Sequence, residues 1–163
     1  MTTAMGTITV ERRLNGSPEE AFAYFTDPEL HVLWLGTHAE LDPSPGGEYV
    51  IQMAPGSRVL GRYLEIDPPK RIVLEWGIDA EPDPDTPAVV YSVPPGSTTV
   101  EITFAPDGDA TIVRLVQTGL RDDAAVGFTT FGWTGYLDRL LRLRAGIDPG
   151  PDPFSGKARP SRS

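Results

Sequence analysis

The sequence contains no cysteine. This absence excludes disulfide bonds, thiolate nucleophiles and zinc or iron–sulfur sites built from cysteine ligands. Histidine is almost as scarce, with two residues, and they do not occur in an HExxH-type spacing. A GxSxG turn for a serine nucleophile is also missing, and no glycine-rich phosphate loop joins a strand to a helix. The sequence therefore offers no established motif for catalysis or nucleotide binding.

Basic residues and long apolar runs are also in short supply. The 14 Lys and Arg face 23 Asp and Glu, for a formal net charge of -9. Because proteins bind phosphate backbones through clustered Lys and Arg, we expect no nucleic-acid partner. No stretch approaches the roughly 20 apolar residues of a membrane span, and the first residues do not resemble a signal peptide. We therefore expect a cytoplasmic protein without membrane insertion.

The longest element that the sequence predicts is a helix over residues 122–146. Apolar side chains in its second half recur at spacings of three and four, which places them on one face: Trp133, Tyr136, Leu137, Leu140, Leu141 and Leu143. Three glycines interrupt the first half: Gly127, Gly132 and Gly135. Each costs roughly 1 kcal/mol relative to alanine inside a helix. Their presence indicates that a strand backbone or a ligand approaches this helix closely.

The remaining chain predicts two short helices and an antiparallel sheet. Residues 7–12 alternate as a strand does, and Ser17, Pro18 and Glu20 form a capping box that begins a helix over 18–25. A second cap-and-proline pair begins a helix over 28–35. Period-two alternation then predicts six strands, over 38–42, 48–54, 58–66, 71–77, 98–105 and 110–118.

Two segments do not fit regular elements. The connection over residues 78–95 is long and acidic, and we interpret it as a solvated loop. The alternative is a lid that closes a cavity mouth through Val89, Val90 and Tyr91. Residues 147–163 are rich in Pro, Gly, Ser and basic residues, which predicts a flexible tail after a single domain over residues 5–146.

Several segments together resemble a known family. The chain contains SPEEAFAYFTDPELHVLWLG, then PGGEY, then GRYLEIDPPKRIVLEW, and a late Gly-Trp pair. In order and spacing, over about residues 5–145, it resembles the family of the activator of the ninety-kilodalton heat-shock-protein ATPase. That resemblance implies the START-like, Bet v 1-like (SRPBCC) helix-grip fold.

The helix-grip fold is of the α+β class. It implies a strand, two helices, six strands and a final helix, with the antiparallel sheet curved around that helix. The family's structural hallmarks correspond here to Thr26-Asp27-Pro28, Trp34, Gly46-Gly47 and Gly132-Trp133. None of these is a catalytic signature. The long acidic segment at residues 78–95 departs from the family pattern.

A cavity between sheet and helix would draw its wall from aromatic, soft and glycine residues. The candidate ligand pocket consists of Phe25, Trp34, Met53, Tyr63, Trp76, Tyr91, Arg114, Gln117, Phe128, Phe131, Gly132 and Trp133. Arg114 and Gln117 lie on opposite faces of one strand, so one of them faces inward. Glu75 and Arg62 on neighbouring strands are the candidate partners of the inward residue. A buried arginine–glutamate pair there would orient a ligand or transfer protons. Charged residues that alternate with Ile, Val and Leu along a strand more often mark the solvent face.

The two histidines are weighed as metal ligands. His31 and His38, with Asp27, Glu29 or Glu40, have the donor chemistry for zinc or iron. They lie across a predicted helix-to-strand junction without a metal-binding spacing, so surface or packing roles are favoured. Ser17 is assigned to helix capping. We predict no catalytic residue, no metal and no cofactor.

The function that follows is the binding of a small hydrophobic or amphipathic molecule between the sheet and the last helix. Two alternatives come from the resemblance. Relatives in the superfamily include polyketide cyclases and aromatases, which would make the chain an enzyme that uses the same cavity. The family name suggests instead a chaperone-regulating interaction protein. A homodimer is compatible with all three.

Overall fold

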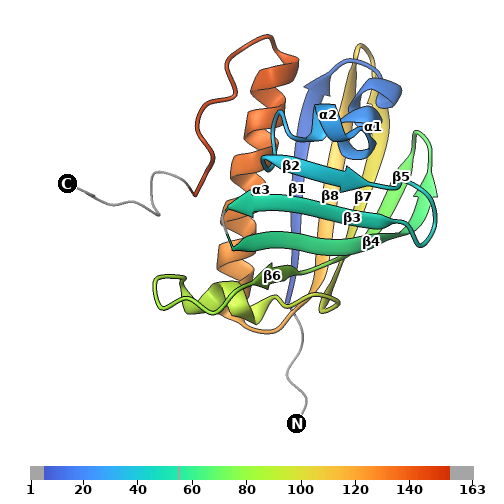
Figure 1. The fold of residues 1–163 in the computed structure, drawn as a ribbon. Helices are drawn as coiled ribbons and strands as arrows, with labels where there is room; N and C mark the ends of the chain where they lie inside the picture. Colours follow the sequence, from blue (N-terminus) through green and yellow to red (C-terminus); the bar gives the residue numbers. More distant parts are fainter. Residues whose placement is uncertain (1–5, 55, 155–163) are drawn as a thin grey trace.

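The computed structural model describes residues 6–54 and 56–154 of the chain. Its strands form one eight-stranded antiparallel sheet in the order β1-β8-β7-β5-β4-β3-β2, with β6 paired to β4. The elements labelled in Figure 1 are β1 (Gly6–Asn15), α1 (Pro18–Thr26), α2 (Pro28–His31), β2 (His38–Leu41), β3 (Glu48–Ala54), β4 (Ser57–Asp67), β5 (Arg71–Trp76), β6 (Ile78–Ala80), the 3₁₀ helix η1 (Ala88–Ser92), β7 (Thr98–Asp107), β8 (Ala110–Leu120) and α3 (Asp123–Arg144).

This arrangement confirms the predicted α+β helix-grip fold. It differs from the predicted order by one strand, β6, which lies inside the segment at residues 78–95. With three residues, β6 is too short to show period-two alternation in the sequence. Its pairing with β4 fixes the start of that segment against the sheet.

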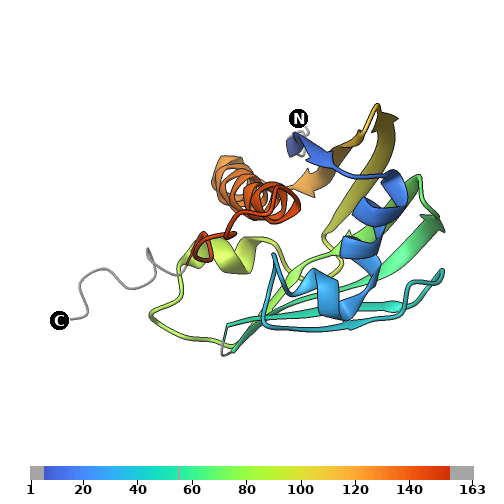
Figure 2. The ribbon, with the colours of Figure 1, turned by 90° about the horizontal axis from the view of Figure 1, so that it is seen from above.

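The sheet curves strongly, and this curvature creates an interior. In Figure 1, β2, β3 and β4 cross the direction of β1, β7 and β8. Seen from above in Figure 2, the sheet bends around the space that α3 borders on one side and α1 and α2 on another. Inward side chains fill much of this space; Ile102 of β7 and Leu115 of β8, for example, are paired across the two strands and fully buried.

The second helix is shorter than predicted. A helix over residues 28–35 was expected, but α2 ends at His31. The backbone N–H of Trp34 donates to the His31 carbonyl only three residues back, which tightens the turn. This turn carries Trp34 and Leu35 into the core, where the Trp34 indole donates to the Tyr24 carbonyl at 3.0 Å. Tertiary packing therefore ended the helix earlier than local propensity suggested.

Residues 147–154, the first part of the predicted flexible tail, fold back along α3 (Figure 1). Arg139 and Arg142 of α3 donate to the carbonyls of Gly150 and Pro149. The Phe154 ring lies 5.3 Å from the Phe128 ring, centroid to centroid. Polar anchors from the helix and aromatic packing hold this stretch despite its proline- and glycine-rich composition. The rest of the predicted tail, residues 155–163, lies outside the described residues.

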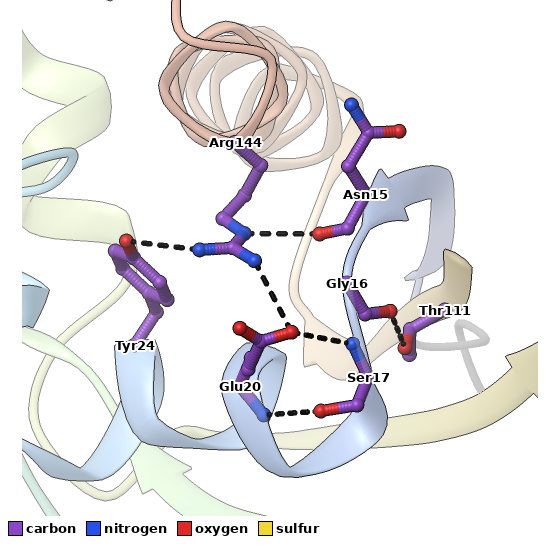
Figure 3. Close-up of polar contacts among 7 residues, drawn as sticks. All are labelled: Asn15, Gly16, Ser17, Glu20, Tyr24, Thr111 and Arg144. Carbon is purple, nitrogen blue, oxygen red and sulfur yellow. Dashed lines mark hydrogen bonds and ion pairs between the residues drawn. The ribbon is translucent and has the colours of Figure 1, made fainter. Parts of the chain in front are cut away.

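Arg144 fastens the end of α3 to β1 and α1 (Figure 3). Its Nε donates to the Asn15 carbonyl at 3.0 Å, and its Nη2 lies 3.5 Å from a Glu20 carboxylate oxygen. Its guanidinium carbon lies 5.4 Å from the centre of the Tyr24 ring, a cation–π arrangement. One half-buried side chain thus joins the end of the last helix to two consecutive elements near the start of the chain.

The predicted capping box at the start of α1 is confirmed and belongs to the same cluster (Figure 3). The Glu20 carboxylate accepts from the Ser17 N–H at 2.8 Å, and the Ser17 hydroxyl accepts from the Glu20 N–H at 3.2 Å. The Ser17 N–H, and then the charge of Arg144, hold the pKa of Glu20 below its ordinary value. Glu20 therefore stays ionised at neutral pH and available to Arg144.

Candidate functional site

A cavity of about 600 Å³ lies between α3 and the sheet. Its wall comes from the turn after α2, strands β3 to β6, the segment around η1, α3 and the end of the described chain. The lining residues are Leu35, Thr37, Met53, Ser57, Val59, Trp76, Ile78, Pro87, Val90, Val93, Phe128, Thr129, Gly132, Trp133, Tyr136, Asp152 and Phe154. Most are apolar, and the volume falls within the range of small-molecule sites.

One face of α3 supplies the longest part of the wall. Phe128, Thr129, Gly132, Trp133 and Tyr136 recur at spacings of three and four, so they share that face. Across the cavity the Trp133 ring lies 4.8 Å from the Trp76 ring of β5, measured between centroids. The two indoles connect helix and sheet at the inner end of the cavity.

A chain of hydrogen bonds behind these indoles satisfies the polar groups there. The Trp133 indole donates to the Gln117 side-chain oxygen at 2.7 Å, and the Gln117 amide donates to the Thr98 hydroxyl at 2.9 Å. That hydroxyl donates in turn to the Trp76 carbonyl at 2.7 Å. Because all three side chains have partners, they present no unpaired polar group to a ligand.

A second polar pair lies on the cavity wall itself. The Tyr136 hydroxyl donates to the Asp152 carboxylate at 2.8 Å, and the other carboxylate oxygen accepts from the Phe154 N–H at 2.9 Å. Burial, followed by the bond to Asp152, raises the pKa of Tyr136 well above its ordinary value. Tyr136 is therefore a neutral donor at physiological pH. This pair also fixes the end of the described chain against the cavity.

The segment over residues 78–95 forms one side of the cavity. Its second half packs inward, with Val90 and Val93 in the lining and Val93 buried. The acidic stretch before η1 is exposed, and the Tyr91 hydroxyl donates to the Glu81 carbonyl at 2.9 Å, which closes that stretch into a loop. The interpretation as a solvated loop thus holds for the acidic half and is wrong for the half that contains η1.

Five of the twelve predicted pocket residues line the cavity: Met53, Trp76, Phe128, Gly132 and Trp133. Four others are buried outside it: Phe25, Trp34, Tyr63 and Gln117. The first three of these pack under α1 and α2, where the Tyr63 hydroxyl donates to the Phe25 carbonyl at 2.9 Å. They are core residues that do not line the cavity.

Three predicted pocket residues are exposed: Tyr91, Arg114 and Phe131. Arg114 alternates with the buried Val113 and Leu115 and therefore faces solvent, whereas Gln117 faces inward. Glu75 pairs with Arg62 at 3.4 Å on the outer face of the sheet. The hypothesis of an inward arginine–glutamate pair is therefore wrong, and the solvent-face interpretation is confirmed.

The sequence did not point to several lining residues. Tyr136 was placed on the apolar face of the helix but not in the pocket, and Thr129, Asp152 and Phe154 were not considered. The helical spacing from Phe128 to Tyr136 is a signal that includes Thr129 and Tyr136. Asp152 and Phe154 carry no such signal, because only the fold brings them to α3.

The two histidines have different environments. His31 is buried; its Nδ1 is 2.9 Å from the Tyr24 carbonyl and its Nε2 is 2.6 Å from the Tyr49 hydroxyl, so both ring nitrogens have partners. His38 is exposed and lies 3.5 Å from Glu40. Within the described residues, no three histidine or carboxylate side chains gather as metal ligands do.

Over the same part of the chain, none of the helices combines the length and the apolar character needed to cross a membrane. No protein with a curated function matches this chain. Among solved structures, an AHSA1-like protein from Rhizobium etli is 38% identical, with 96% of this chain and 94% of that chain covered and a TM-score of 0.65.

More distant structures share the fold. Protein MLL2253 from Mesorhizobium loti is 26% identical over 88% of this chain and 99% of that one, with a TM-score of 0.72. An HSP90 activator from Plasmodium falciparum is 21% identical over 86% and 96%, with a TM-score of 0.64. The family described as "Activator of Hsp90 ATPase homolog 1-like protein" matches residues 15–144. The chain belongs to this family of proteins like the Hsp90 ATPase activator homologue.

Proposed function

We propose that this protein binds a small hydrophobic or amphipathic molecule in the cavity between α3 and the sheet. The observation that carries the proposal is the cavity itself, about 600 Å³ with a mostly apolar lining. Protein interiors are normally packed with few voids larger than a water molecule. A hollow of this size beside a well-packed core therefore supports a binding role.

The polar groups around the cavity support the same proposal. Trp133 and Gln117 satisfy each other, and Tyr136 is bonded to Asp152. Such a wall removes apolar surface of a ligand from water without leaving the protein's own polar groups unpaired. Burying about 200 Å² of apolar ligand contributes roughly 5 kcal/mol before the costs of association. Micromolar affinity therefore needs a larger ligand or an additional polar contact.

The geometry favours binding over the enzymatic alternative. The residues that motivated catalysis, Arg114 and Glu75, lie outside the cavity. Tyr136 and Asp152 are the ionisable side chains in the described lining, and they are hydrogen-bonded to each other. Their arrangement supports a role in holding the wall and the chain end together.

The proposal predicts that Gly132→Leu abolishes most binding of a neutral fluorescent probe, N-phenyl-1-naphthylamine. Gly132 lines the cavity, and a Cβ added there would already lie 3.3 Å from the Phe154 ring. A leucine side chain must therefore occupy the cavity or displace Phe154. Titration of the probe should show saturable fluorescence enhancement with the natural protein and at least a tenfold weaker affinity with the variant.

Gly127→Leu is the matched control. Gly127 lies on the same helix, is exposed, and would place an added Cβ in open space. This variant should bind the probe as the natural protein does, and circular dichroism should show both variants folded. Equal binding by a folded Gly132→Leu protein would place the probe elsewhere and remove the support for this cavity.

A further inference from the structure

Thr129 is a buried polar side chain on the cavity wall that the fold itself does not explain. It lies on α3 with 7% of its surface exposed, and it belongs to the cavity lining. Across the described residues, its hydroxyl forms no hydrogen bond to another group of the chain.

The accessibility of the Thr129 hydroxyl oxygen can be deduced by comparison with the other side-chain polar atoms. Every side-chain nitrogen or oxygen that is sealed from solvent in residues 6–54 and 56–154 has a hydrogen-bond partner. Because the Thr129 hydroxyl has none, its oxygen is not sealed from solvent, and the residue to which it belongs lines the cavity. Its neighbour Thr130 behaves differently and donates to the Val126 carbonyl at 2.7 Å, the usual local bond of a helical threonine.

The charges of the wall restrict what can meet this hydroxyl. No lysine, arginine or histidine belongs to the described lining, and Asp152 contributes a carboxylate. Arg139 lies on the same helix, but it donates to the carbonyls of Trp34 and Gly150 and does not line the cavity. An anionic head group would lose its hydration here without gaining a cationic partner.

We infer that the ligand is an uncharged, largely apolar molecule whose hydroxyl or carbonyl oxygen hydrogen-bonds to Thr129. This inference rests on the proposed function and adds the ligand class and the residue that selects it. The Thr129 hydroxyl supplies a polar contact that apolar burial alone lacks. A carboxylate, sulfonate or phosphate of the same body size binds more weakly because it meets no base.

The test compares three probes with one ring system: naphthalene, 2-naphthol and 2-naphthoate. Calorimetric titration at neutral pH should rank 2-naphthol tightest and 2-naphthoate weakest with the natural protein. Thr129→Val keeps the shape of the side chain and removes the hydroxyl. Its affinity for 2-naphthol should fall about fivefold, the worth of one net hydrogen bond, while naphthalene binding stays unchanged.

Thr130→Val is the control, because the Thr130 hydroxyl is exposed and already bonded within the helix. It should leave all three affinities as they are. Two results overturn this inference and leave the proposed function standing. In the first, naphthalene binds but the affinity for 2-naphthol is the same in Thr129→Val as in the natural protein. In the second, 2-naphthoate binds as tightly as 2-naphthol. Binding of none of the probes to the folded natural protein removes both.

Discussion

At the scale of single residues, His31 illustrates how burial changes the chemistry of a side chain. A carbonyl oxygen only accepts hydrogen bonds, so the Nδ1 of neutral His31 must carry the proton donated to Tyr24. The Nε2 then accepts from the Tyr49 hydroxyl. Burial lowers the pKa of His31 to about 4 and is only partly opposed by the bond to Tyr24. The fold therefore stabilises the neutral ring.

This pKa predicts a loss of stability in mild acid. Because the folded pKa lies below the unfolded value near 6.5, the stabilisation is complete above pH 6.5 and decreases as the pH falls toward 4. The free energy of unfolding should decrease by about 2 kcal/mol between pH 7.5 and pH 5. Urea unfolding at a series of pH values measures it.

His38→Gln separates the two histidines. His38 is exposed, and the chain has only these two, so the variant leaves His31 as the single histidine that titrates. We expect the decrease with pH to remain in His38→Gln. A stability that is equal at pH 7.5 and pH 5 would contradict the assignment of a neutral, buried His31.

At the scale of elements, two glycines of α3, Gly132 and Gly135, face a neighbour that the sequence did not identify. Their cost predicted a close approach by a strand or a ligand, but the described chain end at Pro153 and Phe154 lies there. A Cβ at Gly135 would lie 2.5 Å from the Pro153 Cγ. Glycine spacing indicated that something approaches the helix; the identity of the neighbour depended on where the chain turns after α3.

Gly135→Ala is predicted to detach residues 149–154 from α3. Both Gly135→Ala and Gly127→Ala improve helix propensity by roughly 1 kcal/mol. Only the first forces Pro153 to move, since an added Cβ at Gly127 meets open space. Thermal unfolding should therefore show a gain for Gly127→Ala that is reduced or absent in Gly135→Ala.

Hydrogen exchange provides the direct readout of this segment. The amides of Gly150, Asp152 and Phe154 should exchange faster in Gly135→Ala and at the natural rate in Gly127→Ala. Unchanged exchange in Gly135→Ala would show that the segment tolerates the added methyl group and does not depend on the glycine.

At the scale of the whole molecule, the charged contacts near the end of α3 follow the part of the helix that lines the cavity. The end of the helix is fastened by the Arg12–Asp138 ion pair at 2.7 Å, by the Arg139 bond to the Trp34 carbonyl at 2.7 Å and by Arg144. The cavity lining begins at Phe128 and ends at Tyr136. Residues 138–144 hold the helix in position, and residues 128–136 form the wall of the cavity.

Arg144→Met is therefore predicted to affect stability and not binding. It removes the contacts to Asn15, Glu20 and Tyr24 while it keeps most of the apolar stem, and should lower the free energy of unfolding by about 1–2 kcal/mol. Probe affinity should remain within twofold of the natural protein. Arg142→Met is the control, since Arg142 is exposed and its guanidinium donates to the Pro149 carbonyl at 3.2 Å, away from β1 and α1. A large loss of binding in a folded Arg144→Met protein would contradict this division.

The sequence by itself determined the local elements and the class of fold. The capping signal at Ser17, the alternation along β7 and the glycine turns act over a few residues, so they can be recognised without the rest of the chain. Tertiary structure decided which inward side chains line a cavity and which only pack. The curvature of the sheet placed Tyr63 under α1 and Trp76 opposite Trp133, and the turn after α3 brought Asp152 to Tyr136. Such contacts join residues that no sequence period relates, which is why they required the folded chain.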